Sequence, residues 1–153
     1  MEYTQRIHAV SPTVLRVGLP LSFRILFGAF ALFMGMIMFV DGSVAPIPGV
    51  LFFVALGATF FVDEWYFDSE THAVRRRFGW LFVIRTTTYP VSELAGVRHE
   101  LGTPRRPRKP VHSVSIETKD GRRLTIDLGS GREREMEDAA RLIARHLEID
   151  LLP

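Results

Sequence analysis

Basic residues gather in two short runs whose guanidinium and ammonium groups could bind anions. Near a membrane surface, such groups attract anionic lipid headgroups. The first run is consecutive, and the second alternates with prolines that favour an extended loop. A solvated strand face and a solvated surface loop would explain the same residues without any ligand. The residues are Arg75, Arg76, Arg77, Arg105, Arg106, Arg108 and Lys109.

Trp80 follows the first basic run and is succeeded by Leu81 and Phe82. This apolar cluster either plugs a core at the start of a strand or forms a loop tip that dips into lipid or contacts a partner. We therefore add Trp80 to the candidate residues for lipid or partner contact.

No residue pattern indicates catalysis or metal binding. The five histidines are dispersed, the chain has no cysteine, and it contains neither an H-E-x-x-H motif, a G-x-S-x-G turn nor a glycine-rich phosphate loop. We predict a protein that is not an enzyme, with no cofactor, no metal and no small-molecule substrate. Nucleic acid is not expected as a partner, because acidic residues are interspersed among the arginines and the formal net charge is only +2.

The elements that position these residues divide the chain at a change of composition. Between Leu21 and Val62 the only charged residues are Arg24 and Asp41, whereas nearly all other charges follow Asp63. A bilayer core about 30 Å thick needs about 20 apolar residues in a helix. Residues 21–40 and 44–62 fit two such spans, separated by glycines and prolines that favour a reversal. We expect a transmembrane helical hairpin over residues 21–62.

A cleaved signal peptide, a buried helical hairpin of a soluble protein and a single re-entrant element are the alternatives for this stretch. Basic residues flank the outer ends of the pair, and the connecting loop has none. The positive-inside rule therefore places residues 1–20 and residues 63–153 in the cytoplasm, with both termini on that side.

Small residues recur on one face of each expected helix, where they let two backbones approach closely. Packing within the hairpin explains them, and docking on another membrane protein is the alternative. The residues are Gly28, Ala31, Gly35, Gly49 and Gly57.

Residues 63–128 have strand character. Apolar and polar residues alternate in 111–118 and 122–128, a pair joined by Lys119-Asp120-Gly121, so one face should be buried and Ser115 should lie on the wet face. Earlier strands are expected at 63–68, 73–78, 83–89 and 96–101, with reversals at 69–72 and at Gly79-Trp80. An antiparallel sheet follows. Residues 13–19 could be a strand of this domain or an interfacial segment.

The last part of the domain is expected to be an amphipathic helix over residues 132–147. Ser130 and Glu133 fit a capping box. Met136, Ala140, Ile143 and Leu147 recur at helical spacing on one stripe. This helix would close an open end of the sheet, and residues 149–152 could follow as a tail against the same surface.

The stretch YFDSETHAVRRRFGWLFVIRTTTYPVSELAGVR, Tyr66 to Arg98, together with a membrane hairpin before it and a helix after it, resembles the bacterial pleckstrin-homology-like (PH-like) family of membrane proteins. A similar plan occurs in assembly factors of photosynthetic membrane complexes. The resemblance implies a mainly-β (α+β) PH-like domain on a hairpin in the bacterial inner membrane. Phosphoinositide-binding relatives use basic residues in the first strand-to-strand loop, but the matching turn here, residues 69–72, has no lysine.

Two functions follow as expectations. The first is a structural, accessory or assembly subunit that docks on a larger membrane protein complex or self-associates. The second is a tethered module that binds anionic lipid or a peptide segment through the loop at 105–109 and an exposed sheet edge.

Overall fold

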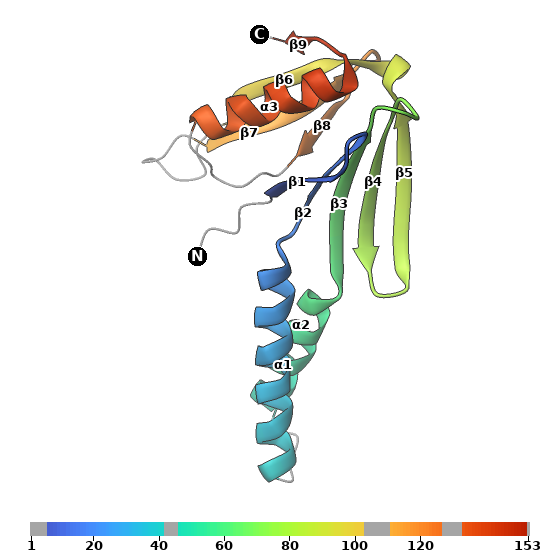
Figure 1. The fold of residues 1–153 in the computed structure, drawn as a ribbon. Helices are drawn as coiled ribbons and strands as arrows, with labels where there is room; N and C mark the ends of the chain where they lie inside the picture. The colour runs from blue at the N-terminus through green and yellow to red at the C-terminus, as the bar shows by residue number, and fades with distance from the viewer. Residues whose placement is uncertain (1–5, 42–45, 103–110, 127–132, 153) are drawn as a thin grey trace.

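The chain has an α+β fold. The computed structural model describes residues 6–41, 46–102, 111–126 and 133–152, and these residues form three α-helices and two β-sheets. In Figure 1 two helices form a stalk at one end, and the two sheets with the third helix lie at the other.

The stalk is a pair of antiparallel helices, α1 (Leu21–Asp41) and α2 (Pro46–Thr59). The first matches the expected span closely, but the second is shorter than expected, because residues 61 and 62 belong to a strand. Pro46 and Pro48 lie in the first turn of α2. They are tolerated there because the first turn of a helix has backbone N–H groups without intrahelical partners.

Among the described residues, one helix, α1 over Leu21–Val40, is long and apolar enough to cross a membrane. The 14 residues of α2 span about 21 Å, less than a bilayer core of about 30 Å. Large apolar side chains on both helices are exposed, including Phe39 at 87% and Ile47 at 72%.

The first sheet has five antiparallel strands in chain order. They are β1 (Arg6–Ser11), β2 (Val14–Gly18), β3 (Phe61–Asp68), β4 (Ala73–Trp80) and β5 (Val83–Pro90). The N-terminal residues that sequence alone left open therefore form strands, and the helical pair is inserted between the neighbours β2 and β3. The second reversal lies at Leu81-Phe82, not at Gly79-Trp80 as expected. Both expected turn residues complete β4 and extend the β4–β5 hairpin toward α2 (Figure 1).

A short 3-10 helix, Val91–Glu93, leads into the second sheet, whose strand order is β8-β7-β6-β9. Its strands are β6 (Leu94–Gly102), β7 (Val111–Thr118), β8 (Arg123–Ile126) and β9 (Leu151–Leu152). The predicted hairpin of β7 and β8 is confirmed. Two details were wrong: the tail strand β9 is parallel to β6, so the sheet is mixed, and Ser115 is buried because both faces of β7 are covered there.

The core lies between the sheets and α3 (Glu133–Leu147). The predicted apolar stripe of this helix is confirmed, since Met136, Ala140, Ile143 and Leu147 are at most 3% exposed. His146 adds a polar link: its Nε2–H donates to the carbonyl oxygens of Thr13 at 2.9 Å and Phe67 at 3.1 Å. The capping residue Ser130 lies outside the described residues.

Candidate functional site

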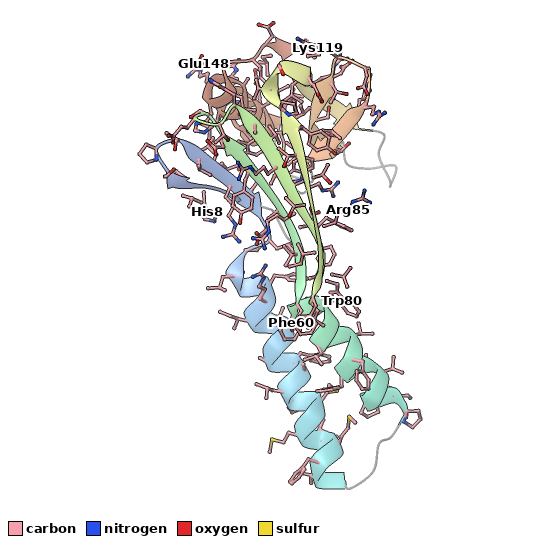
Figure 2. The ribbon with its side chains drawn as sticks, turned by 90° about the vertical axis from the view of Figure 1, so that its right-hand side faces the viewer. His8, Phe60, Trp80, Arg85, Lys119 and Glu148 are labelled. Carbon is pink, nitrogen blue, oxygen red and sulfur yellow. The ribbon has the colours of Figure 1, made fainter. Side chains whose placement is uncertain are left out.

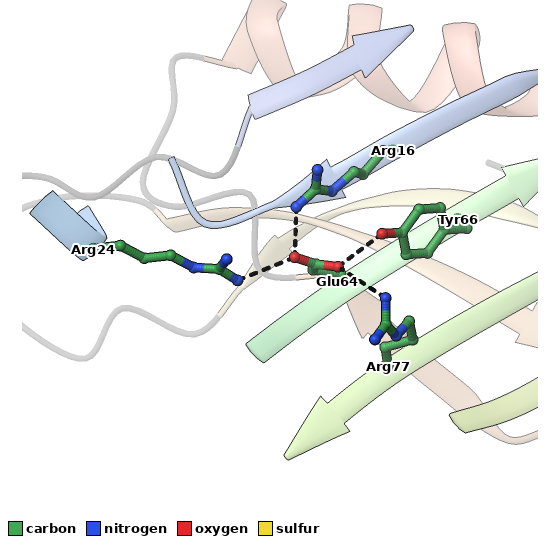
Figure 3. Close-up of polar contacts among 5 residues, drawn as sticks. All are labelled: Arg16, Arg24, Glu64, Tyr66 and Arg77. Carbon is green, nitrogen blue, oxygen red and sulfur yellow. Dashed lines mark hydrogen bonds and ion pairs between the residues drawn. The ribbon is translucent and has the colours of Figure 1, made fainter. Parts of the chain in front are cut away.

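A polar cluster around Glu64 lies where the helical pair meets the first sheet (Figure 3). Glu64 Oε1 accepts hydrogen bonds from Arg16 Nη2 at 2.5 Å and from Arg24 Nη2 at 3.2 Å. Its other oxygen, Oε2, accepts one from the Tyr66 hydroxyl at 2.8 Å and lies 3.9 Å from Arg77 Nη1. One carboxylate thus joins α1 to three strands of the sheet.

Strand register and helix position explain why these residues meet. Tyr66 faces Arg16 across β2–β3, and Arg77 faces Glu64 across β3–β4, so alternate residues of three strands share one face. Gly18 faces Glu64 from β2, and a Cβ there would lie 3.2 Å from Glu64 Cγ. Arg24 reaches the same carboxylate from the first turn of α1.

The electrostatics of the cluster keep Glu64 ionised. Its side chain is only 6% exposed. Burial alone would raise the pKa of Glu64, but the Tyr66 hydrogen bond and the charges of Arg16 and Arg24 outweigh that effect and lower the pKa from its ordinary value of 4.5. Three guanidinium groups around one carboxylate leave the cluster with a net charge of +2, so it can attract a further anion.

The end of the β4–β5 hairpin carries apolar residues instead of the Asn and Gly that usually occupy such turns. We call Trp80, Leu81, Phe82 and Val83 the β4–β5 tip. Phe82 is 95% exposed and Val83 is 80% exposed. Leu81 adopts a φ of 52°, a left-handed conformation that is uncommon for a bulky side chain.

The β4–β5 tip contacts the end of α2, as Figure 2 shows near Phe60 and Trp80. The indole N–H of Trp80 donates to the carbonyl of Gly57, and the backbone N–H of Leu81 donates to the carbonyl of Phe60 at 3.4 Å. Trp80 therefore does not plug the core; half of its side chain, 51%, is exposed beside the helical pair.

The predicted run of arginines is divided between the two faces of β4. Arg75 is exposed, and Arg77 joins the Glu64 cluster. Arg76 lies on the opposite face, where its Nε is 3.3 Å from Asp63 Oδ1 and its guanidinium carbon is 4.9 Å from the ring centre of Trp65. The structure therefore does not gather the three arginines into one anion site. Arg105, Arg106, Arg108 and Lys109 lie outside the described residues.

The small residues predicted for helix packing fall into two groups. Gly28 and Gly35 of α1 lie against Thr59 and Phe52 of α2, because a Cβ at either glycine would be 3.3 to 3.6 Å from those side chains. The Cβ position of Gly57 instead faces Trp80, so this glycine makes room for the β4–β5 tip. Ala31 and Gly49 are buried.

The centre of the cluster was not predicted from the sequence. Glu64 and Tyr66 were part of an expected strand, and Arg16 and Arg24 were treated only as topology signals. The available signal was a glutamate within the aromatic and apolar run FFVDEWYF, directly after the second helix. A carboxylate that becomes buried within such a run requires cationic or hydrogen-bonding partners.

Within the described ranges, no group of three or more histidine, aspartate or glutamate side chains is arranged to hold a metal ion. No protein-family model matches the chain, and a search of curated proteins finds no significantly similar sequence.

Proposed function

We propose that this chain is a non-enzymatic accessory subunit of a bacterial inner-membrane complex, in which the helical pair spans the membrane as a hairpin and a PH-like domain docks on a partner from the cytoplasmic side. The exposed apolar surface of α1 and α2 and the small-residue contacts between them support the membrane hairpin. Two sheets followed by one C-terminal helix that packs against them support the PH-like resemblance.

The short second helix is compatible with a membrane setting, because the β4–β5 tip supplies apolar surface where α2 ends. Gly28 lies level with Thr59, so α1 continues for seven residues, about 10 Å, beyond the end of α2. The tip lies at the end of α2, where it contacts Gly57 and Phe60. In this arrangement the Glu64 cluster lies at the headgroup level and the tip lies deeper.

The observation that carries the docking proposal is the free edge of β5. This strand has 8 residues, pairs with β4 on one side, and has no partner on the other side among the described strands. An unpaired edge of this length can accept a strand from another chain through backbone hydrogen bonds. Because β5 begins at the tip that contacts the end of α2, a partner that is itself in the membrane is favoured.

Site-specific photo-crosslinking in membranes of expressing cells tests this proposal. A photoreactive residue replaces Thr88, which is exposed on β5, and the matched control replaces Arg134, which is exposed on α3. We expect one defined adduct from position 88, with a membrane protein or a second copy of the chain, and none from position 134. Identical adducts from both positions, or purification in mild detergent as a lone monomer, would contradict the proposal.

Contact with anionic lipid is the second candidate function. The excess positive charge around Glu64, beside the start of α1, favours it. In this candidate function the lipid would meet Arg16, Arg24 and Arg77 around Glu64, so only one arginine of the β4 run takes part.

A further inference from the structure

We infer that the hollow between the β1–β2 hairpin and the start of α1 binds a phosphate group, supplied by the headgroup of an anionic glycerophospholipid. The hollow has a volume of about 310 Å³ and is lined by His8, Arg16, Arg24 and the connecting residues 18–21. Because a water molecule occupies about 30 Å³ in the liquid, a phosphodiester fits this volume. The inference rests on the membrane setting proposed above, but not on docking at β5.

Two arginines that line the hollow have hydrogen-bonding capacity left over. Each donates one Nη2–H to the same oxygen of Glu64, and a guanidinium group carries five N–H donors. Nε of Arg24 is buried and has no hydrogen-bond partner among the described residues. A buried donor of this kind is normally satisfied, so Nε of Arg24 indicates a missing acceptor.

The positive charge of the arginines at the site also exceeds the single negative charge of Glu64. One carboxylate is surrounded by Arg16, Arg24 and Arg77, all within 3.9 Å. The nearby Asp63 does not reduce this excess, because it pairs with Arg76 on the opposite face. The first turn of α1 contains no acidic residue, so the positive end of its helix dipole adds to the same potential. A phosphate monoanion is the complementary ligand.

The surroundings of the hollow select a lipid over a free anion. Leu21, which lines it, is 71% exposed, and Ile25, one turn further along α1, is 61% exposed. In the proposed orientation these side chains face the hydrocarbon just below the headgroups. A lipid whose phosphate contacts the arginines would lay its acyl chains along them.

Lipid retention by the full-length protein tests the inference. The protein is purified in mild detergent and incubated with equal amounts of phosphatidylglycerol and phosphatidylcholine, and native mass spectrometry counts the retained lipids. We expect wild-type protein to enrich phosphatidylglycerol, and Arg24→Gln and Arg16→Gln each to reduce that enrichment about fivefold. The matched control, Arg85→Gln, removes an exposed arginine from β5 and should retain the enrichment.

Glu64→Gln separates phosphate binding from a purely structural role of the arginines. If the arginines only form ion pairs with Glu64 and bind no lipid, this substitution removes those ion pairs and leaves lipid retention unchanged. If they bind phosphate, it removes a competing anion and should increase phosphatidylglycerol enrichment about fivefold. If an arginine variant fails to fold, lipid retention by Glu64→Gln still distinguishes the two roles.

Three results would overturn the inference: no preference of the wild type for phosphatidylglycerol, equal retention by all variants, or an unchanged Glu64→Gln. A titration of delipidated protein with inorganic phosphate distinguishes the source, since displacement of phosphatidylglycerol by millimolar phosphate would assign the site to a soluble anion. Loss of lipid preference in a protein that still resists extraction from membranes would contradict this site alone. Release from membranes by alkaline carbonate would contradict the proposed function as well.

Discussion

At the scale of single residues, Glu64 joins the helical pair to the sheet, and its ionisation is coupled to folding. Its pKa is lowered in the folded protein, although burial opposes that change, because Tyr66 and the arginines stabilise the carboxylate. A carboxyl group whose pKa is lowered by folding stabilises the folded state at pH values above its ordinary pKa of 4.5. This stabilisation is lost as the pH falls through the pKa of the folded state. We expect the folded protein to lose stability as the pH falls from 4.5 toward the lower pKa that Glu64 has in the folded state.

Glu64→Gln tests this coupling. The variant should lose about 1–3 kcal/mol of unfolding free energy near neutral pH, because hydrogen bonds to a charged group become hydrogen bonds to an amide. It should also lose the part of the acid dependence that belongs to this carboxylate. Urea titrations between pH 3 and 7 in detergent micelles measure both effects. Glu70→Gln, at an exposed position in the β3–β4 turn, is the control, and an equal acid response in the two variants would contradict the assignment.

At the scale of elements, the close approach of β9 to β6 depends on Gly96. A Cβ at this position would lie 2.6 Å from the carbonyl oxygen of Asp150 and 2.8 Å from Leu152 Cγ. We expect Gly96→Val to displace β9 and to cost about 1–3 kcal/mol through overpacking. Hydrogen exchange at the Val97 amide, which donates to Asp150 at 2.9 Å, should accelerate. Ala95→Val, at the preceding position of the same strand, is the control; comparable acceleration at the Val97 amide in this variant would contradict a specific role of Gly96.

Elements defined by interactions between residues close in the sequence were predicted well, whereas elements defined by contacts between distant residues were not. The β7–β8 pair and the α3 stripe follow from local periodicity, and both were predicted well. The end of α2 was placed at residue 62 because Phe61 and Val62 are as apolar as the helix before them. Only pairing with β4 makes them strand residues. Register across the long insertion between β2 and β3 likewise brings Arg16 to Glu64, and no local pattern encodes that contact.

At the scale of the whole molecule, the proposed membrane position predicts different environments for the two tryptophans, Trp65 and Trp80. Trp65 is 1% exposed and belongs to the core, whereas Trp80 is 51% exposed in the β4–β5 tip. Arg77, in the Glu64 cluster, precedes Trp80 by three residues, about 10 Å along β4. With the cluster at the headgroups, Trp80 should therefore lie at the outer part of the acyl chains.

Quenching by brominated lipids measures this difference, because each single substitution leaves one tryptophan as the reporter. In vesicles whose lipids carry bromine near the headgroup end of the acyl chain, Trp65→Phe should show strong quenching of Trp80. The reciprocal variant, Trp80→Phe, should show little quenching of Trp65. Bromine placed near the bilayer centre should quench Trp80 less, because the tip reaches only the level of the first turns of α1. Equal quenching of the two tryptophans would contradict the position of the tip in the bilayer. Because the tip and the Glu64 cluster share strand β4, such a result would also contradict the position of the cluster at the headgroups.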